Sequence, residues 1–241
     1  MKYLIILSVL IAVLISACTK EDTPTSPPID NRIEFEITFL DYSENNYFIN
    51  EVYTDTSSGL NIFESFYGSP VPTISIKHFV KDIEVYKSTN QIGQRGIIAH
   101  AYIDLPPRYD WEKYSDSLRQ NSTIIIGQDE MLRFRLLNAG MDYLFHPETG
   151  YISFISPLSH QDIIAVAYKI ENNSPDFSDD LNYGEFFTDL INNSDTIAVL
   201  KLVKPQNLQP YFSKAWKLKM KNRYKIESDL GRISDLDLDI Y

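Results

Sequence analysis

The amino-acid sequence predicts a mainly β protein, an antiparallel β-sandwich with one or two short helices. Three observations support this fold class. Apolar and polar residues alternate with a period of two through many short segments, which is typical of strands buried on one face. Turn-forming residues separate these segments, and few long helical patterns lie between them. The chain also holds 16 Tyr and 13 Phe but only 9 Gly, which favours aromatic-rich strands.

The strands are expected from residue 33 onward. In the first, Ile33, Phe35, Ile37 and Phe39 alternate with polar residues. Further strand candidates are residues 73–79, 82–86, 96–105, 122–126, 132–137, 151–155, 163–170 and 196–203. Residues 234–241 alternate Asp with apolar residues and are expected to form one more strand, with the Asp side chains on a solvent-exposed face.

The best helix candidate is residues 109–121. Trp111, Tyr114 and Leu118 recur there at helical spacing, directly after Pro106 and Pro107. Prolines suit the start of a helix, so a helix of one or two turns is expected at this point.

The segment 216–225 fits two structures. Its apolar residues alternate with Lys and Arg, which favours a strand with one basic, solvated face. Phe212, Trp216, Met220 and Tyr224 also recur every four residues, so a helix is the alternative.

The N-terminus contains the only cysteine of the chain, Cys18. An apolar run from Leu4 to Ile15 precedes Ser16, Ala17 and this cysteine. The run is shorter than the roughly 20 residues that a bilayer span needs. The motif Ile15-Ser16-Ala17-Cys18 resembles the lipobox of bacterial lipoproteins. Residues 1–17 are therefore expected to be a signal peptide, with lipidation of Cys18 holding the mature chain on a membrane.

Residues 18–31 are rich in Pro, Thr and Ser and are expected to form a flexible tether. Lys20, Glu21 and Asp22 resemble the export signal of surface-displayed lipoproteins in Bacteroidota; ordinary linker charge is the alternative. Residues 32–241 then form the β-rich region. A division into two subdomains, about 32–128 and 129–241, stays open.

Composition and motifs exclude several functions. The formal net charge of −11 argues against nucleic-acid binding, which needs a basic surface. The histidines, His78, His100, His146 and His160, show no metal-ligand spacing and are expected on the surface or in turns. No phosphate-binding loop or nucleophile elbow occurs in the sequence. No cofactor, no metal and no enzymatic activity are therefore expected.

The order of several segments resembles the repeated modules of the SprA family, the gliding-motility and type 9 secretion proteins of Bacteroidota. The segments that carry the likeness are residues 81–86, 97–105, 134–143, 148–154, 164–168, 183–186, 200–205 and 216–224. The likeness covers roughly residues 74–241. It departs from the family in length, because the family protein is a very large barrel-forming polypeptide, and in the lipobox.

The resemblance implies a non-enzymatic outer-membrane lipoprotein on the periplasmic or cell-surface face. Such a module would have an interaction or scaffold role, with protein partners in type 9 secretion or gliding motility. A flat apolar surface or an open sheet edge would favour this hypothesis.

Two other functions stay open. A surface glycan-binding lipoprotein would use Tyr109, Trp111 and Tyr114 as a stacking platform, although core packing of these rings is the stronger interpretation. A hydrolase would need a carboxylate pair that the sequence does not reveal; Glu34 with Glu36, or Glu84 with Asp104, are nominal choices. A solvent-facing aromatic groove would favour the first, and buried acids in a deep cleft the second.

Overall fold

The computed structural model describes residues 41–56, 61–91, 96–171, 179–190 and 196–224. All of them belong to one compact unit, Thr38–Ile226. The signal peptide and tether, including Cys18 and the Lys20–Asp22 motif, lie outside the described residues. The strands expected at residues 33–39 and 234–241 lie outside them as well.

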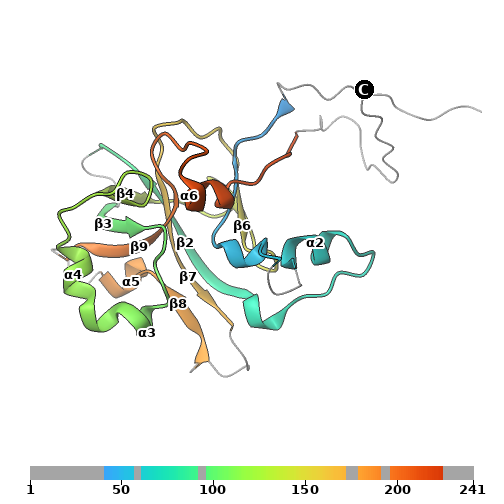
Figure 1. Ribbon diagram of the computed structural model, residues 1–241, viewed down its shortest axis with the longest axis horizontal. Helices are drawn as coiled ribbons and strands as arrows, with labels where there is room; N and C mark the ends of the chain where they lie inside the picture. Colours follow the sequence, from blue (N-terminus) through green and yellow to red (C-terminus); the bar gives the residue numbers. More distant parts are fainter. Residues whose placement is uncertain (1–40, 57–60, 92–95, 172–178, 191–195, 225–241) are drawn as a thin grey trace, which may run out of the picture. The chain divides into compact units, whose positions relative to one another are not determined.

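The larger of two sheets in the described residues closes on itself (Figure 1). Its strand order is β2 (Val80–Ser88), β4 (Asp129–Leu136), β3 (Gly96–Tyr102), β9 (Ala198–Lys204), β7 (Ile164–Ile170) and β8 (Leu181–Tyr183). Because β2 also pairs with β7, the first five strands form a ring, and β8 extends it from β7. The pairs are antiparallel except β3 with β9, which run parallel.

The smaller sheet has three antiparallel strands. They are β1 (Asn46–Phe48), β6 (Tyr151–Phe154) and β5 (Tyr143–His146), with β6 in the middle. Buried residues of both sheets belong to one apolar cluster, which includes Tyr47 and Ile152 of the small sheet and Val166 and Leu200 of the large one. The prediction of a mainly β protein is confirmed.

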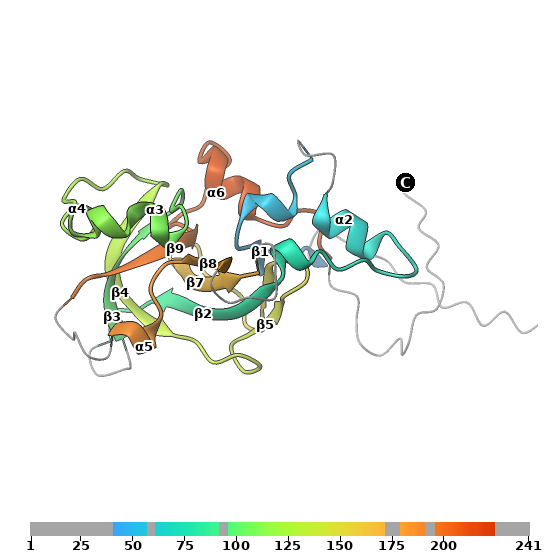
Figure 2. The ribbon, with the colours of Figure 1, turned by 90° about the horizontal axis from the view of Figure 1, so that it is seen from below.

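The helices of the described residues are all short, as the sequence predicts. They are η2 (Glu51–Tyr53), α2 (Ile62–Tyr67), η3 (Ile76–His78), α3 (Arg108–Trp111), η4 (Glu112–Tyr114), α4 (Ser115–Arg119), α5 (Phe187–Leu190) and α6 (Ser213–Leu218). Figures 1 and 2 show α3 and α4 at one end of this unit and α2 at the opposite end. Among these helices, none has the length and apolar character needed to cross a bilayer.

Two predicted strands are wrong. Residues 73–79 form the short helix η3 and irregular backbone, and Ile74 and Ile76 are exposed. Residues 122–126 form a loop. Both segments were predicted to be strands from their composition alone. A strand also needs a neighbouring strand whose backbone N–H and C=O groups are free to pair with it.

The helix predicted at 109–121 is present in pieces, as the consecutive turns α3, η4 and α4. The strand favoured for 216–225 is wrong in its first part. There α6 buries Ala215 and Leu218, so the helical alternative is confirmed through Leu218. Beyond it, Lys219 and Tyr224 form isolated bridges with Tyr47 and Tyr42.

The described residues do not divide near residue 128. Strands β2 and β3 precede that position, and they pair with β4, β7 and β9, which follow it. The closed sheet is therefore built from both halves of the chain.

Candidate functional site

Three consecutive isoleucines face solvent in the loop between α4 and β4. We name residues 122–128 the isoleucine loop; it lies at the left of Figure 1. The exposed fractions are 42% for Ile124, 50% for Ile125 and 76% for Ile126. Single exposed apolar residues are ordinary, but a contiguous group of them is typical of an interaction surface.

The side chain of Asp129, the first residue of β4, is hydrogen-bonded to the backbone of the isoleucine loop. Its Oδ1 accepts a hydrogen bond from the backbone N–H of Ile125 at 2.7 Å. The backbone N–H groups of Gln128 and Asp129 in turn donate to the carbonyl oxygen of Ile125, at 2.9 and 3.1 Å. Asp129 is only 3% exposed, so the carboxylate that accepts from the exposed Ile125 is itself buried.

A buried polar network continues from Asp129 into the closed sheet. Asp129 Oδ2 lies 2.8 Å from Nε2 of His100, and Nδ1 of His100 lies 2.9 Å from the Tyr102 hydroxyl. Tyr102 donates to the carbonyl oxygen of Leu118 in α4 at 2.6 Å. Burial raises the pKa of Tyr102 to about 12, so its hydroxyl keeps its proton at neutral pH. The network therefore joins β3, β4 and α4 beneath the loop.

This network corrects the prediction for His100. The side chain is fully buried and stacks on the ring of Tyr102, with 4.2 Å between ring centroids. Ala99, His100 and Ala101 are all buried although they alternate between the two faces of β3, so alternation in the sequence does not show that His100 is buried.

The isoleucine loop also contacts the segment before α6. Gly127 has φ +81°, and a Cβ at this position would lie 2.3 Å from the ring of Phe212. Phe212 packs edge-to-face against Tyr211, whose side chain is 76% exposed. This close approach holds the segment that contains Tyr211 next to the isoleucine loop.

A cavity of about 170 Å³ opens beside the loop. Its lining includes Ile125 together with Tyr114, Leu118, Ile103 and Leu105, and it is mostly apolar. Such a depression next to exposed isoleucines suits an apolar side chain of another molecule.

The residues predicted as a glycan platform do not lie together. Trp111 is 1% exposed and packs with Leu105 and Val199, so it belongs to the core. Tyr109 is 69% exposed and Tyr114 is 41% exposed. Tyr114 lines the cavity beside the isoleucine loop, whereas Tyr109 lines a different, open groove. That groove is lined by Arg108, Tyr109, Glu112, Asp179, Asp180, Leu181 and Asn182.

The nominated carboxylates serve separate contacts. Glu84 Oε2 accepts hydrogen bonds from the Tyr86 hydroxyl at 2.5 Å and from the Phe187 N–H at 2.6 Å. Asp104 pairs with Lys214 at the surface. Glu34 and Glu36 lie outside the described residues.

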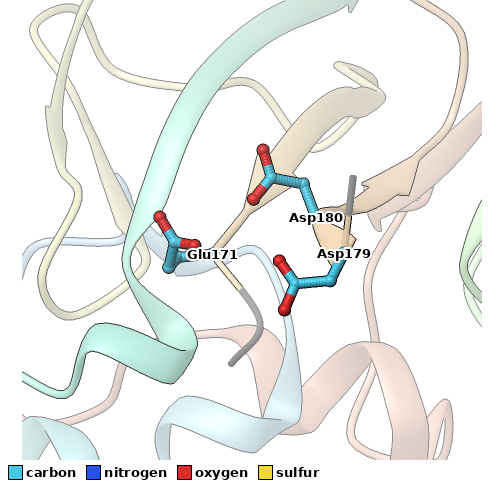
Figure 3. Close-up of side chains that lie close together, drawn as sticks. All are labelled: Glu171, Asp179 and Asp180. Atoms are coloured by element: carbon cyan, nitrogen blue, oxygen red, sulfur yellow. The ribbon is translucent and has the colours of Figure 1, made fainter. Parts of the chain in front are cut away.

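The structure brings together three acids that the sequence did not single out. Glu171, Asp179 and Asp180 each place one carboxylate oxygen within 4.8 Å of the others (Figure 3). The only sequence signal was the pair Asp179-Asp180 directly before a strand. Glu171 lies eight positions before Asp179, so its proximity depends on the β7–β8 pairing.

Comparison with known proteins does not assign the chain to a family. No protein-family model matches the sequence, and a search of curated proteins found no match.

Proposed function

We propose that this protein is a non-enzymatic outer-membrane lipoprotein module whose isoleucine loop binds an apolar surface of a partner protein. The partner would belong to a type 9 secretion or gliding-motility apparatus, on the periplasmic or cell-surface face. The observation that carries the proposal is the exposure of Ile124, Ile125 and Ile126 over a buried hydrogen-bond network.

The network matters because it fixes the loop before a partner arrives. Ordering a mobile loop on binding costs free energy, and a loop held by buried hydrogen bonds avoids much of that cost. Asp129 and His100 also have their hydrogen-bonding groups engaged in this support, which gives the buried pair a structural role.

The proposed cellular location of the protein is based on its sequence. A lipid on Cys18 would hold the domain near a membrane through the tether 18–31, and the SprA-like segments point to secretion or motility. The expected sandwich remains our interpretation of how the two sheets pack across their shared core.

A pull-down from an outer-membrane extract tests the proposal, with the mature chain as bait. Wild type should recover a translocon or motility component. Ile126→Ser should reduce the recovery about tenfold, because it removes the most exposed of the three apolar side chains.

The matched control is Ile76→Ser, a change of the same kind at a residue that is 66% exposed in η3. It should leave recovery unchanged. The proposal fails if wild type recovers no such component, or if the two variants behave alike.

The groove at Tyr109 supports glycan binding as the second candidate function. An exposed tyrosine beside Arg108 and Asn182 offers a stacking face and hydrogen-bonding groups in one open site. Titration calorimetry with oligosaccharides tests it: Tyr109→Ala should abolish binding, while Tyr211→Ala, at another exposed tyrosine, should not. No heat with wild type would dismiss this candidate.

A further inference from the structure

Three carboxylates converge where β7 ends and β8 begins. Glu171 directly follows β7, and Asp179 and Asp180 directly precede β8. Figure 3 shows the carboxylates of Asp179 and Asp180 on the side that faces Glu171. Oxygens from all three lie within 4.8 Å of one another.

Burial makes this group more than a surface cluster. The side chain of Glu171 is 9% exposed and that of Asp180 is 1% exposed. Lys81 on β2 pairs with one oxygen of each, Glu171 Oε2 at 2.5 Å and Asp180 Oδ1 at 2.9 Å. The other oxygens, Glu171 Oε1 and Asp180 Oδ2, are buried without a hydrogen-bond partner in the described part of the chain. A buried carboxylate oxygen that has lost its water requires a donor or a cation.

Lys81 is one cation shared by two of the acids, because its ammonium pairs with both Glu171 and Asp180. It contacts only one oxygen of each carboxylate. A divalent cation bound between the three acids would give the other two buried oxygens a partner.

The donor set and its spacing favour calcium over magnesium. Carboxylate oxygens are ligands of both hard cations, but magnesium needs near-ideal octahedral geometry at about 2.1 Å. Calcium accepts irregular sets of ligands at about 2.3–2.6 Å, so ligands on opposite sides of the ion can lie about 5 Å apart. The oxygens of the three acids all lie within 4.8 Å of one another, which is inside this reach, and they form such an irregular set.

The site is also open to solvent on one side. Asp179 and Asp180 line the groove that Arg108 and Tyr109 border. An ion can enter from this groove and keep water molecules as its remaining ligands.

We propose that Glu171, Asp179 and Asp180 bind one calcium ion at the junction of β7 and β8. The affinity expected for an extracellular module with three protein carboxylates is about 10⁻⁴–10⁻³ M. The bound ion joins the end of β7 to the start of β8, and so stabilises the folded state by linkage. The proposal does not depend on the function of the isoleucine loop.

Calorimetric titration of CaCl₂ into the metal-stripped mature chain tests this site, together with thermal unfolding in EDTA and in millimolar CaCl₂. Wild type should bind one calcium ion and unfold at a higher temperature when calcium is present. Glu171→Gln and Asp180→Asn should each weaken binding about tenfold or more, because each removes a charged ligand.

Asp104→Asn is the matched control, because it removes a carboxylate that pairs with Lys214 at the surface. It should bind calcium as wild type does. If a buried variant does not unfold cooperatively in EDTA, Asp179→Asn replaces it. The proposal is overturned if wild type shows neither heat nor a thermal shift, or if the cluster variants respond as the control does.

Discussion

Asp129 connects the isoleucine loop to the protein interior through both of its carboxylate oxygens. One accepts from the Ile125 N–H, and the other contacts His100. Because the carboxylate and the imidazole are both buried, neither can exchange its partner for water. A buried network of this kind stabilises only while each member keeps its hydrogen bonds.

We expect Asp129→Ala to lower the free energy of unfolding by about 3 kcal/mol, because it leaves Nε2 of His100 and the Ile125 N–H without their partner. Urea denaturation measures this change. Asp104→Ala is the control, since it breaks only the surface pair with Lys214 and should have little effect. Equal effects of the two variants would show that the network does not support the fold.

Single residues were predicted unevenly from the sequence. Core packing was the stronger interpretation for Tyr109, Trp111 and Tyr114, and it is correct for Trp111 but wrong for the two exposed tyrosines. His100 was not expected in the core, because its partner Asp129 lies 29 positions away and only the β3–β4 pairing brings them together. Glu171 and Asp180 were missed for the same reason. Polar contacts between distant segments leave no local pattern.

The isoleucine loop shows why composition can mislead at the scale of an element. Thr123 and three isoleucines suggest a strand, yet β3 and β4 already pair with each other up to Tyr102 and Asp129. Residues 122–126 join neither sheet of the described residues, and their backbone turns back toward Asp129 instead. Gly127, with its positive φ, lets that turn pack under Phe212.

A pair of glycine variants separates backbone strain from packing in this loop. Gly140 has nearly the same φ as Gly127, +80° against +81°, but nothing lies within 4 Å of its added Cβ. Gly127→Ala should therefore destabilise the protein by about 1 kcal/mol or more beyond Gly140→Ala, because Phe212 must also move. Thermal unfolding of both variants measures the difference. Equal losses would mean that the contact with Phe212 contributes nothing.

Strand length explains most of which strands the sequence could predict; the four-residue β6, predicted as 151–155, is the exception. Strands β2, β3, β4, β7 and β9 have seven or more residues and show a clear alternation or apolar run. Strands β1, β5 and β8 have three or four residues, too few to establish a period. Segment 216–225 fits both the period of a strand and the spacing of a helix. Its first residues are helical in the structure, where α6 buries Ala215 and Leu218.

For the molecule as a whole, β9 is buried along its entire length and includes two buried lysines. The ammonium of Lys201 donates to the carbonyl oxygens of Ile103 and Leu105, and that of Lys204 donates to those of His160 and Asp162. Burial lowers the pKa of both lysines to about 8 from the ordinary value of 10.5.

These lysines predict an unusual dependence of stability on pH. Between pH 8 and 10 the folded chain has released protons that the unfolded chain still binds, so the free energy of unfolding should rise with pH. Above pH 10 it should fall, because burial raises the pKa of Tyr102 and Tyr143 to about 12 while unfolded tyrosines ionise. Urea denaturation across this range measures both slopes.

Lys201→Met together with Lys204→Met should flatten the rise. Lys113→Met, at an exposed residue of η4, should preserve it. A wild-type stability that is constant or falls from pH 8 to 10 would contradict the assignment to buried lysines.

The predicted lipid anchor is tested on the whole protein in cells. Cys18→Ser should move the protein from the membrane fraction to the soluble fraction, because the acyl chains supply the attachment. Fractionation and immunoblotting measure it. A variant that stays in the membrane fraction would show that the lipobox interpretation is wrong.

The central claim, that the isoleucine loop is a protein-binding surface, is tested most directly by photo-crosslinking in living cells. A photoreactive amino acid would replace Ile126 in one strain and Ile76 in another. The account predicts a crosslinked adduct with a secretion or motility component at position 126 and none at position 76. No adduct at position 126, or the same adducts at both positions, would contradict it.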